Sequence, residues 1–434
     1  MRRRTDGDAY VPGHGDPSFA VDHYDLDLTV NLAANALSGV ATLTCRALAD
    51  LASFELDLYR LRVGKVVIDG RPPAKHAQRR HKVVLRPRAT IPAGAAFTVK
   101  IPYSGSPRPM PGKDGEAGWE ELEDGLIVAS QPHGAPSWFP CNDRPDDKAT
   151  YAFTVTAPQG YTVVANGRPG PTRRRGSTRV WTYAEDAPMA SYLATLQIGR
   201  YVALPGESVG VALTTWCPPA RKPAVAEAFA DQPAMVESFS RLFGPYPFAS
   251  YAAVVTDDEL EIPLEAQSLS IFGSNLAYRA WSAQRLIAHE LAHQWFGNSV
   301  TLRHWRDIWL HEGFACYAEW LWSEASGGPT ADAHARQHHA RLSGLPQDLL
   351  LADPGPDDMF DDRVYKRGAL TLHALRLRVG DDAFFDLLRA WTSRFRHSTV
   401  TTDDFVELTG ELTGLDGAEL FSPWLDELPL PALP

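Results

Sequence analysis

The stretch H-E-L-A-H at residues 289–293 decides how this chain is interpreted, and Glu312 follows it after eighteen further residues. On a helix, residues four apart share one face and lie about 6 Å apart along the axis, so His289 and His293 point the same way. Two imidazoles and a carboxylate suit zinc and leave a fourth tetrahedral position open for water. Glu290 lies about 100° further round the helix, close enough to reach that water. The pattern predicts a hydrolytic zinc site.

The neighbouring sequence favours helices on both sides of this motif. Apolar residues recur at helical spacing over 282–296, where Ser282 is the expected N-cap and Gly297-Asn298 the expected stop. A second helical pattern runs from about residue 306 to 325, and a short connection between two antiparallel helices would return Glu312 to the histidines. The alternative is that both histidines are ordinary hydrogen-bonded residues of a core helix.

Composition restricts the class of protein. A chain of 434 residues is expected to form two or three domains, and its 44% hydrophobic and 22% charged residues are ordinary for a globular protein. A net charge of −11 argues against nucleic acid as a partner and favours positively charged ligands, such as a peptide with a free amino terminus. The four cysteines are scattered without a C-x-x-C pair, which predicts free buried thiols in a reducing compartment.

The amino-terminal segment and the hydropathy of the chain bear on its location. Residues 1–4 are basic, but residues 5–17 are polar and lack the apolar region of a secretory signal. No apolar stretch approaches the roughly eighteen residues that a membrane span needs. We therefore expect a cytoplasmic protein without a membrane span, acting as a monomer.

The pattern of predicted elements indicates an α+β protein. Residues 1–203 contain many short alternating or β-branched runs punctuated by turn residues, which predict an antiparallel β-sheet domain. Residues 204–434 are expected to form a mainly helical catalytic domain, with further helices near 222–243, 331–342, 364–379, 383–395 and 402–413. Two basic runs, at 79–82 and 173–176, lie between predicted strands and are interpreted as solvated hairpin tips.

Recognisable sequence segments extend beyond the five-residue motif. The sequence H-E-L-A-H-Q-W-F-G-N at 289–298, with a glutamate nineteen residues past the second histidine, resembles the zinc aminopeptidase family of aminopeptidase N and leukotriene hydrolase, which are gluzincin metallopeptidases. W-L-H-E-G-F-A at 309–315, Y-K-R-G-A at 365–369 and F-P-C-N-D at 139–143 are similar to segments that occur in the same order in that family. The resemblance implies an N-terminal β domain followed by a thermolysin-like zinc domain.

Carried over to this chain, the resemblance implies a role for each matching residue. His289, His293 and Glu312 would bind one zinc ion. Glu290 would be the general base that takes a proton from zinc-activated water and passes it to the leaving amine. Tyr365 would donate a hydrogen bond to the tetrahedral oxyanion.

The same resemblance implies two residues that bind substrate. Glu265 would hold the free α-ammonium group of the peptide, and Gln131 would line the pocket for the first residue. The chain departs from the family at residues 262–263, where Ile-Pro replaces Gly-Ala, and at Ala266, which replaces Asn. Arg367 stands where the family has lysine, and the large helical C-terminal domain of the family is expected to be missing, which would open the cleft.

The expected function is that of a zinc-dependent aminopeptidase acting on peptides with a free N-terminus. A thermolysin-like endopeptidase is the first alternative, favoured by the missing domain, and a catalytically retired peptide-binding protein is the second. Glu319 follows Glu312 by seven residues and shares its helical face, so it is expected either to orient a ligand imidazole or to form a salt bridge.

Overall fold

The chain divides into two units. The structure is a computed structural model that describes residues 7–434, so the basic start at residues 1–4 lies outside the described residues. The first unit extends to Ala203 and includes the short segments Trp216–Pro219 and Ala266–Leu269. The second contains Leu204–Thr215, Ala220–Glu265 and Ser270–Pro434.

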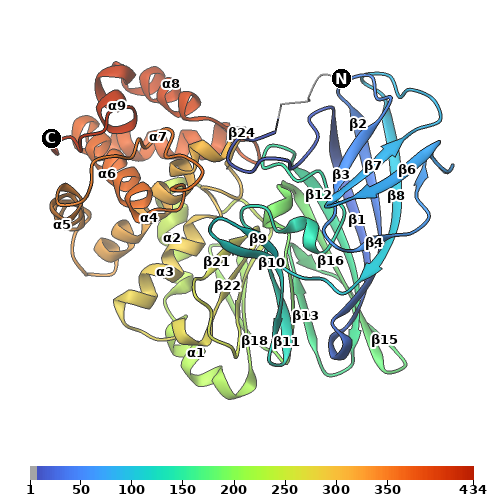
Figure 1. Ribbon diagram of the computed structural model, residues 1–434. Helices are drawn as coiled ribbons and strands as arrows, with labels where there is room; N and C mark the ends of the chain where they lie inside the picture. Colours follow the sequence, from blue (N-terminus) through green and yellow to red (C-terminus); the bar gives the residue numbers. More distant parts are fainter. Residues whose placement is uncertain (1–6) are drawn as a thin grey trace. The chain divides into compact units, whose positions relative to one another are not determined.

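The first unit is built from β-sheets, and Figure 1 shows its long strands lying side by side. The largest sheet has the order β14-β16-β12-β1-β2-β8-β4, with β15 on β16 and β5 on β8. Its strands are β1 (Phe19–Asn31), β2 (Ala36–Ala47), β4 (Arg62–Val63), β5 (Val67–Ile68), β8 (Ala96–Gly105), β12 (Ala149–Pro158), β14 (Arg168–Pro169), β15 (Arg173–Arg175) and β16 (Thr178–Met189).

Smaller sheets complete this unit. One has the order β13-β17-β11-β10-β9 and another the order β3-β7-β6. Their strands are β3 (Phe54–Asp57), β6 (Lys75–Arg79), β7 (Lys82–Arg86), β9 (Met110–Gly112), β10 (Gly115–Leu122), β11 (Gly125–Ala129), β13 (Thr162–Ala165) and β17 (Leu196–Gly199). The basic run at 79–82 forms the turn of the β6–β7 hairpin, as predicted, whereas Arg173–Arg175 is not a hairpin tip but the exposed strand β15, paired with β16.

The prediction of a purely antiparallel domain is wrong in one place, because β1 pairs with β12 in parallel, with His23 opposite Thr150 and Thr29 opposite Thr156. Hairpins force antiparallel pairing only between strands joined by short turns, whereas a parallel pair needs a long crossover. The long stretch between β1 and β12, which holds strands of all three sheets, provides that crossover. The sheet is therefore mixed, within an α+β chain as expected.

Polar side chains near residues 139–147, which include the F-P-C-N-D stretch, fasten the start of the chain to this unit. The Asn142 Oδ1 atom accepts a hydrogen bond from the Asp16 backbone N–H at 2.7 Å. Asp147 accepts from the Val21 N–H at 3.1 Å and from the Asn142 amide at 2.6 Å. All four residues are buried, so this motif has a structural role in the first unit.

The second unit combines a small sheet with a helical body. The sheet has the order β18-β19-β20-β22-β21, and β23 pairs with β24. These strands are β18 (Val202–Ser208), β19 (Val211–Cys217), β20 (Ser250–Val255), β21 (Leu264–Ala266), β22 (Leu269–Phe272), β23 (Thr301–Leu302) and β24 (Thr399–Val400). The helices are α1 (Lys222–Ala228), α2 (Gln232–Phe243), α3 (Trp281–Ala292), α4 (Trp309–Ala325), α5 (Ala331–Ser343), α6 (Asp362–Val379), α7 (Asp381–Arg394), α8 (Thr402–Thr413) and α9 (Gly417–Leu425).

One predicted helix is wrong in its extent. The single helix expected over 222–243 is broken between Ala228 and Gln232 into α1 and α2. Pro233 lies in the first turn of α2, where it lacks an N–H and its ring would clash with the carbonyl four residues earlier in a continuous helix. The four cysteines are free and buried, as expected. Over residues 7–434, none of the helices has the length and apolar character that crossing a membrane requires.

Candidate metal centre

Helix α3 carries the first half of the centre. The helix ends at Ala292, earlier than predicted, and Ala280 rather than Ser282 is its N-cap. His293 is the C-cap, yet its backbone N–H still donates to the His289 carbonyl at 3.2 Å. The four-residue spacing therefore keeps both imidazoles on one face. At Gly297 (φ +127°), a Cβ atom would lie 3.2 Å from the His293 Nδ1 atom, so glycine leaves room for that ring.

Three side chains converge, as the sequence predicts, and we call them the metal triad: His289, His293 and Glu312. The Glu312 Oε2 atom lies 3.2 Å from the His289 Nε2 atom and 3.4 Å from the His293 Nε2 atom. One ligand atom from each residue lies within 4.8 Å of the other two. All three are buried. Two imidazole nitrogens and one carboxylate oxygen form a donor set that fits zinc.

The Nδ1 atoms of the two imidazoles, which we call the outer nitrogens, are within hydrogen-bond distance of other groups. The His289 Nδ1 atom lies 2.8 Å from the Glu319 Oε1 atom, and the His293 Nδ1 atom lies 3.0 Å from the Phe296 carbonyl oxygen. Each acceptor selects the tautomer protonated at Nδ1, because a carbonyl or carboxylate oxygen can only accept. In that neutral tautomer the Nε2 lone pairs can bind a metal ion.

Sequence reasoning found Glu319 but missed the cations around it. Arg285 lies 3.3 Å from the Glu319 carboxylate, and Lys366, which donates to the Cys316 thiol at 3.1 Å, also acts on it electrostatically. Burial alone would raise the pKa of Glu319, but Lys366, His289 and Arg285 together lower it to about 2. Both expected roles of Glu319 therefore hold. Arg285 could have been found, since it precedes His289 by four residues on one helix.

Two further carboxylates lie beside the metal triad. Glu265, Glu290 and His293 offer ligand atoms within 4.8 Å of one another, and Glu265 is only 3% exposed. Burial and the neighbouring carboxylates raise the pKa of Glu265 to about 7 and that of Glu290 well above its usual range. Burial would also raise the pKa of Glu312, but the two imidazoles outweigh it and lower that pKa. The repulsion among these carboxylates is partly offset by the two imidazoles, because the neighbouring carboxylates outweigh burial and raise the pKa of His289 and His293 to about 9.

Tyr365 lies on α6 with its ring centroid 6.0 Å from that of His289. Burial, with the carboxylates of Glu312, Glu265 and Glu290, raises the pKa of Tyr365 well above its usual range. The phenol therefore stays protonated at neutral pH and can donate a hydrogen bond.

A glycine contact brings α6 close to α4. A Cβ atom on Gly313 would lie 2.8 Å from the Gly368 Cα atom, and the same distance separates a Cβ on Gly368 from the Gly313 Cα. Real Cβ atoms do not approach backbone this closely, so both positions require glycine. These are the glycines of the E-G-F-A and R-G-A segments, and they set Tyr365 beside the metal triad.

Gln131 is the predicted site residue that belongs to the first unit. It lies after β11 in the first unit and is half-buried, whereas the other predicted site residues all belong to the second unit. Its role in the pocket for the first substrate residue stays a prediction.

Comparisons with known proteins agree with this geometry. Residues 20–193 match the model of the Peptidase M1 N-terminal domain, and residues 230–424 match that of the Peptidase family M1 domain. The solved M1 zinc metallopeptidase from Deinococcus radiodurans is 31% identical, covers 99% of each chain and superposes with a TM-score of 0.91. The chain belongs to peptidase family M1. The predicted family and enzyme class, a zinc peptide hydrolase, are confirmed.

Other relatives match this chain in part. Aminopeptidase B from Rattus norvegicus is 31% identical over 62% of this M1 chain and 43% of its own length. Aminopeptidase N from Streptomyces lividans is 30% identical over 66% of this chain and 36% of its own. The M1 chain therefore spans less than half the length of these two relatives. Native yeast LTA4 hydrolase, at 23% identity and a TM-score of 0.82, shares the fold.

Proposed function

We propose that this M1 chain is a zinc-dependent aminopeptidase that removes single residues from the amino termini of peptides. The observation that carries the proposal is the buried carboxylate pair, Glu265 and Glu290, within ligand distance of His293. These two carboxylates would provide a position for a cationic group directly beside the hydrolytic metal site. A peptide ammonium group bound there would place the first peptide bond at the metal.

The metal triad would hold the zinc ion, since its three donors converge and its outer nitrogens are already engaged. When bound, zinc polarises the scissile carbonyl and lowers the pKa of water from 15.7 to about 7. Glu290 follows His289 on α3 and is the candidate general base. Its raised pKa suits a carboxylate that takes a proton from the attacking water and delivers it to the leaving amine.

Tyr365 would stabilise the oxyanion that develops on the substrate carbonyl. Its phenol is neutral, half-buried and next to His289, so it can donate without first losing a proton. A donor aimed at such an oxyanion typically contributes about 2.7–4 kcal/mol to transition-state stabilisation.

Glu265 would set the cleavage point. Its carboxylate is buried on β21, and a bound ammonium group would offset the repulsion that raises its pKa. A mutant of the Deinococcus radiodurans metallopeptidase has been solved with a Tyr-Ser-Ala substrate bound, which supports peptides as substrates. Single-residue removal thus depends on Glu265, whereas hydrolysis depends on the metal triad.

We further propose that the enzyme uses one zinc ion and acts as a cytoplasmic monomer. A single ion is supported by the shared imidazole of His293, which belongs both to the metal triad and to the group that it forms with Glu265 and Glu290. Four free buried thiols suit a reducing compartment.

A panel of aminoacyl-arylamides, each paired with its N-acetylated form, tests the proposal. The wild-type protein is expected to cleave free substrates and to act at least about 100-fold more slowly on acetylated ones, because their ammonium group is lost. A chelator should abolish cleavage. Equal rates on both forms would instead indicate an endopeptidase, and no cleavage of any substrate by the zinc-loaded protein would indicate a peptide-binding protein.

A further inference from the structure

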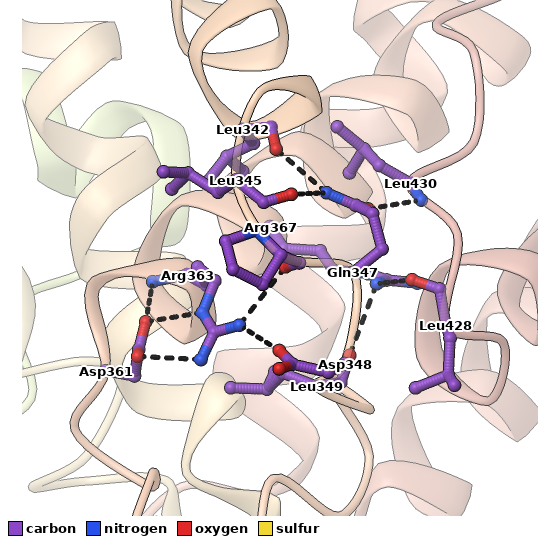
Figure 2. Close-up of polar contacts among 11 residues, drawn as sticks. Leu342, Leu345, Gln347, Asp348, Leu349, Asp361, Arg363, Arg367, Leu428 and Leu430 are labelled. Carbon is purple, nitrogen blue, oxygen red and sulfur yellow. Dashed lines mark hydrogen bonds and ion pairs between the residues drawn. The ribbon is translucent and has the colours of Figure 1, made fainter.

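Arg367 is buried on α6, two residues after Tyr365, and stands where the family motif has lysine. All five of its N–H donors meet backbone carbonyl oxygens, and Figure 2 shows two of these hydrogen bonds. Nε donates to Trp424 at 2.8 Å, Nη1 to Leu428 at 2.9 Å and Leu349 at 3.4 Å, and Nη2 to Pro423 at 3.1 Å and to Glu427.

The end of α9 explains why a cation lies here. The last carbonyls of a helix have no partner within the helix and carry partial negative charge, so a cation is stabilising beside them. Pro423 and Trp424 belong to the last turn of α9, which ends at Leu425. Burial lowers the pKa of Arg367 to about 10, which keeps it charged at neutral pH. A lysine has three donors and no planar fork, so it cannot satisfy five carbonyls.

Residues near Arg367 hold the segment after α9 in place. The Gln347 side chain accepts from the Leu430 N–H at 2.8 Å and donates to the Leu342 and Leu345 carbonyls, both at 2.9 Å (Figure 2). In the same view Arg363, in the first turn of α6, lies between Asp361 and Asp348. The start of α6 and the segment after α9 are therefore joined by directional polar contacts.

Helix geometry connects this contact to the metal centre. Two residues span about 200° around a helix axis, so Tyr365 and Arg367 lie on opposite sides of α6. The backbone of Gly368 rests against Gly313 of α4, the residue after the metal-triad member Glu312. The start of α6 is thus held between the helix that bears Glu312 and the carbonyls at the end of α9.

We propose that Arg367 is a positioning residue for catalysis: by binding the carbonyls at and after the end of α9, it fixes the place of Tyr365 beside the metal triad. The proposal rests on the proposed role of Tyr365 as oxyanion donor. A misplacement of about 1 Å in a catalytic group can cost about 100-fold in rate. The loss is expected in kcat, because the donor acts on the transition state.

The test is a double-mutant cycle of Arg367→Lys with Tyr365→Phe, in the full chain with zinc bound. Arg378→Lys is the matched control, because Arg378 also joins α6 to α9, through a 2.9 Å ion pair with Glu419 whose side chains are 51% and 71% exposed. Rates are expressed per bound zinc, so that only folded chains count. Arg367→Gln, which also lacks the five-donor fork, is measured in parallel in case the lysine variant does not fold.

The expected result is that Arg367→Lys lowers kcat about 10- to 100-fold with KM changed by less than about twofold. In the Tyr365→Phe background the same substitution should change kcat by less than about twofold, because the donor it positions is gone. Arg378→Lys should leave both constants unchanged.

Two results would overturn the inference while leaving the proposed function intact. One is an unchanged kcat in the Arg367 variants, and the other is an equal loss with and without the Tyr365 hydroxyl, which is the mark of a merely structural role. Full activity of Tyr365→Phe alone would instead remove the proposed role of Tyr365, and the positioning role with it.

Discussion

The two units both bury acidic side chains, and the partners of those side chains differ. In the first unit Asp57 is fully buried, forms an ion pair with Lys82 and accepts from the Gly15 N–H at 2.8 Å. Asp143 lies beside it, 2.7 Å from the His14 ring nitrogen and also 2.7 Å from the Ser191 hydroxyl. Burial still raises the pKa of Asp57, but Lys82 and His14 act against that rise, and the cluster fixes the start of the chain.

In the second unit the carboxylates of Glu265, Glu290 and Glu312 gather around two histidines. Burial and repulsion between carboxylates raise the pKa of Glu265 and Glu290. The two imidazoles instead lower the pKa of Glu312. The comparison shows that burial of charge alone does not mark a site. What distinguishes the second unit is that two imidazole nitrogens and a carboxylate oxygen lie within 4.8 Å of one another, which is a donor set for a cation from outside the chain.

The largest expected effect comes from Glu290→Gln, which removes a proposed catalytic carboxylate from the second unit without changing its shape. Loss of a general base should lower kcat about 10²- to 10⁴-fold. Zinc content should stay as in the wild type, and the free energy of unfolding should stay the same or rise, because a repelling carboxylate is gone. Arylamide kinetics with elemental analysis and urea unfolding provide the measurements. Wild-type activity would falsify the general-base role.

Lys82→Met is the corresponding test in the first unit, where we expect stability to fall and activity to stay the same. It leaves Asp57 buried without its partner, which should cost about 3–5 kcal/mol in the free energy of unfolding. Activity per bound zinc should not change. Arg80→Met, at an exposed position of the same hairpin, is the control and should stay within about 0.5 kcal/mol in urea unfolding. A Lys82 variant as stable as this control would show that the ion pair does not compensate Asp57.

Removal of the metal should destabilise the protein by about 2.7–4.1 kcal/mol when free zinc had exceeded its dissociation constant 100- to 1,000-fold. The metal-free chain should also lose stability as pH rises from about 4.5 to 7. Over that range folded Glu265, with its pKa of about 7, keeps a proton that the unfolded chain releases. Thermal unfolding with and without chelator, at pH 5, 6, 7 and 8, measures both effects. A flat pH profile for the chelated protein would contradict the raised pKa of Glu265.

The smallest expected effect concerns the glycine contact in the second unit. Gly368→Ala adds a methyl group 2.8 Å from the Gly313 Cα, so α6 must move and stability should fall by about 1–3 kcal/mol, with a lower kcat. Gly410→Ala on α8 is the control, because its nearest contact would be an ordinary 3.4 Å and alanine favours the helix by about 0.5–1 kcal/mol. Urea unfolding and kinetics distinguish the two. Equal stability of the two variants would show that the close approach is not needed.

The metal triad could be predicted from the sequence because it depends on local spacing and one longer motif. Helix α8 could be predicted to the residue because its ends are marked locally: Thr401 and Asp404 form a capping box and Gly414 ends the helix. The parallel pairing of β1 with β12 could not be predicted, since no local signal encodes contacts between strands that far apart in the chain. The hydrogen bonds of Arg367 could not be predicted either, because they are made to backbone carbonyls, which every residue type carries. The break before Pro233 does have a local signal, because proline does not fit inside a continuous helix.

The zinc content of Glu312→Gln tests the metal triad most directly. After dialysis against metal-free buffer, elemental analysis should find close to one zinc ion per chain in the wild type and in Glu290→Gln, and less than about a tenth of that in Glu312→Gln. Full zinc content in Glu312→Gln would contradict a metal ion held by residues 289, 293 and 312.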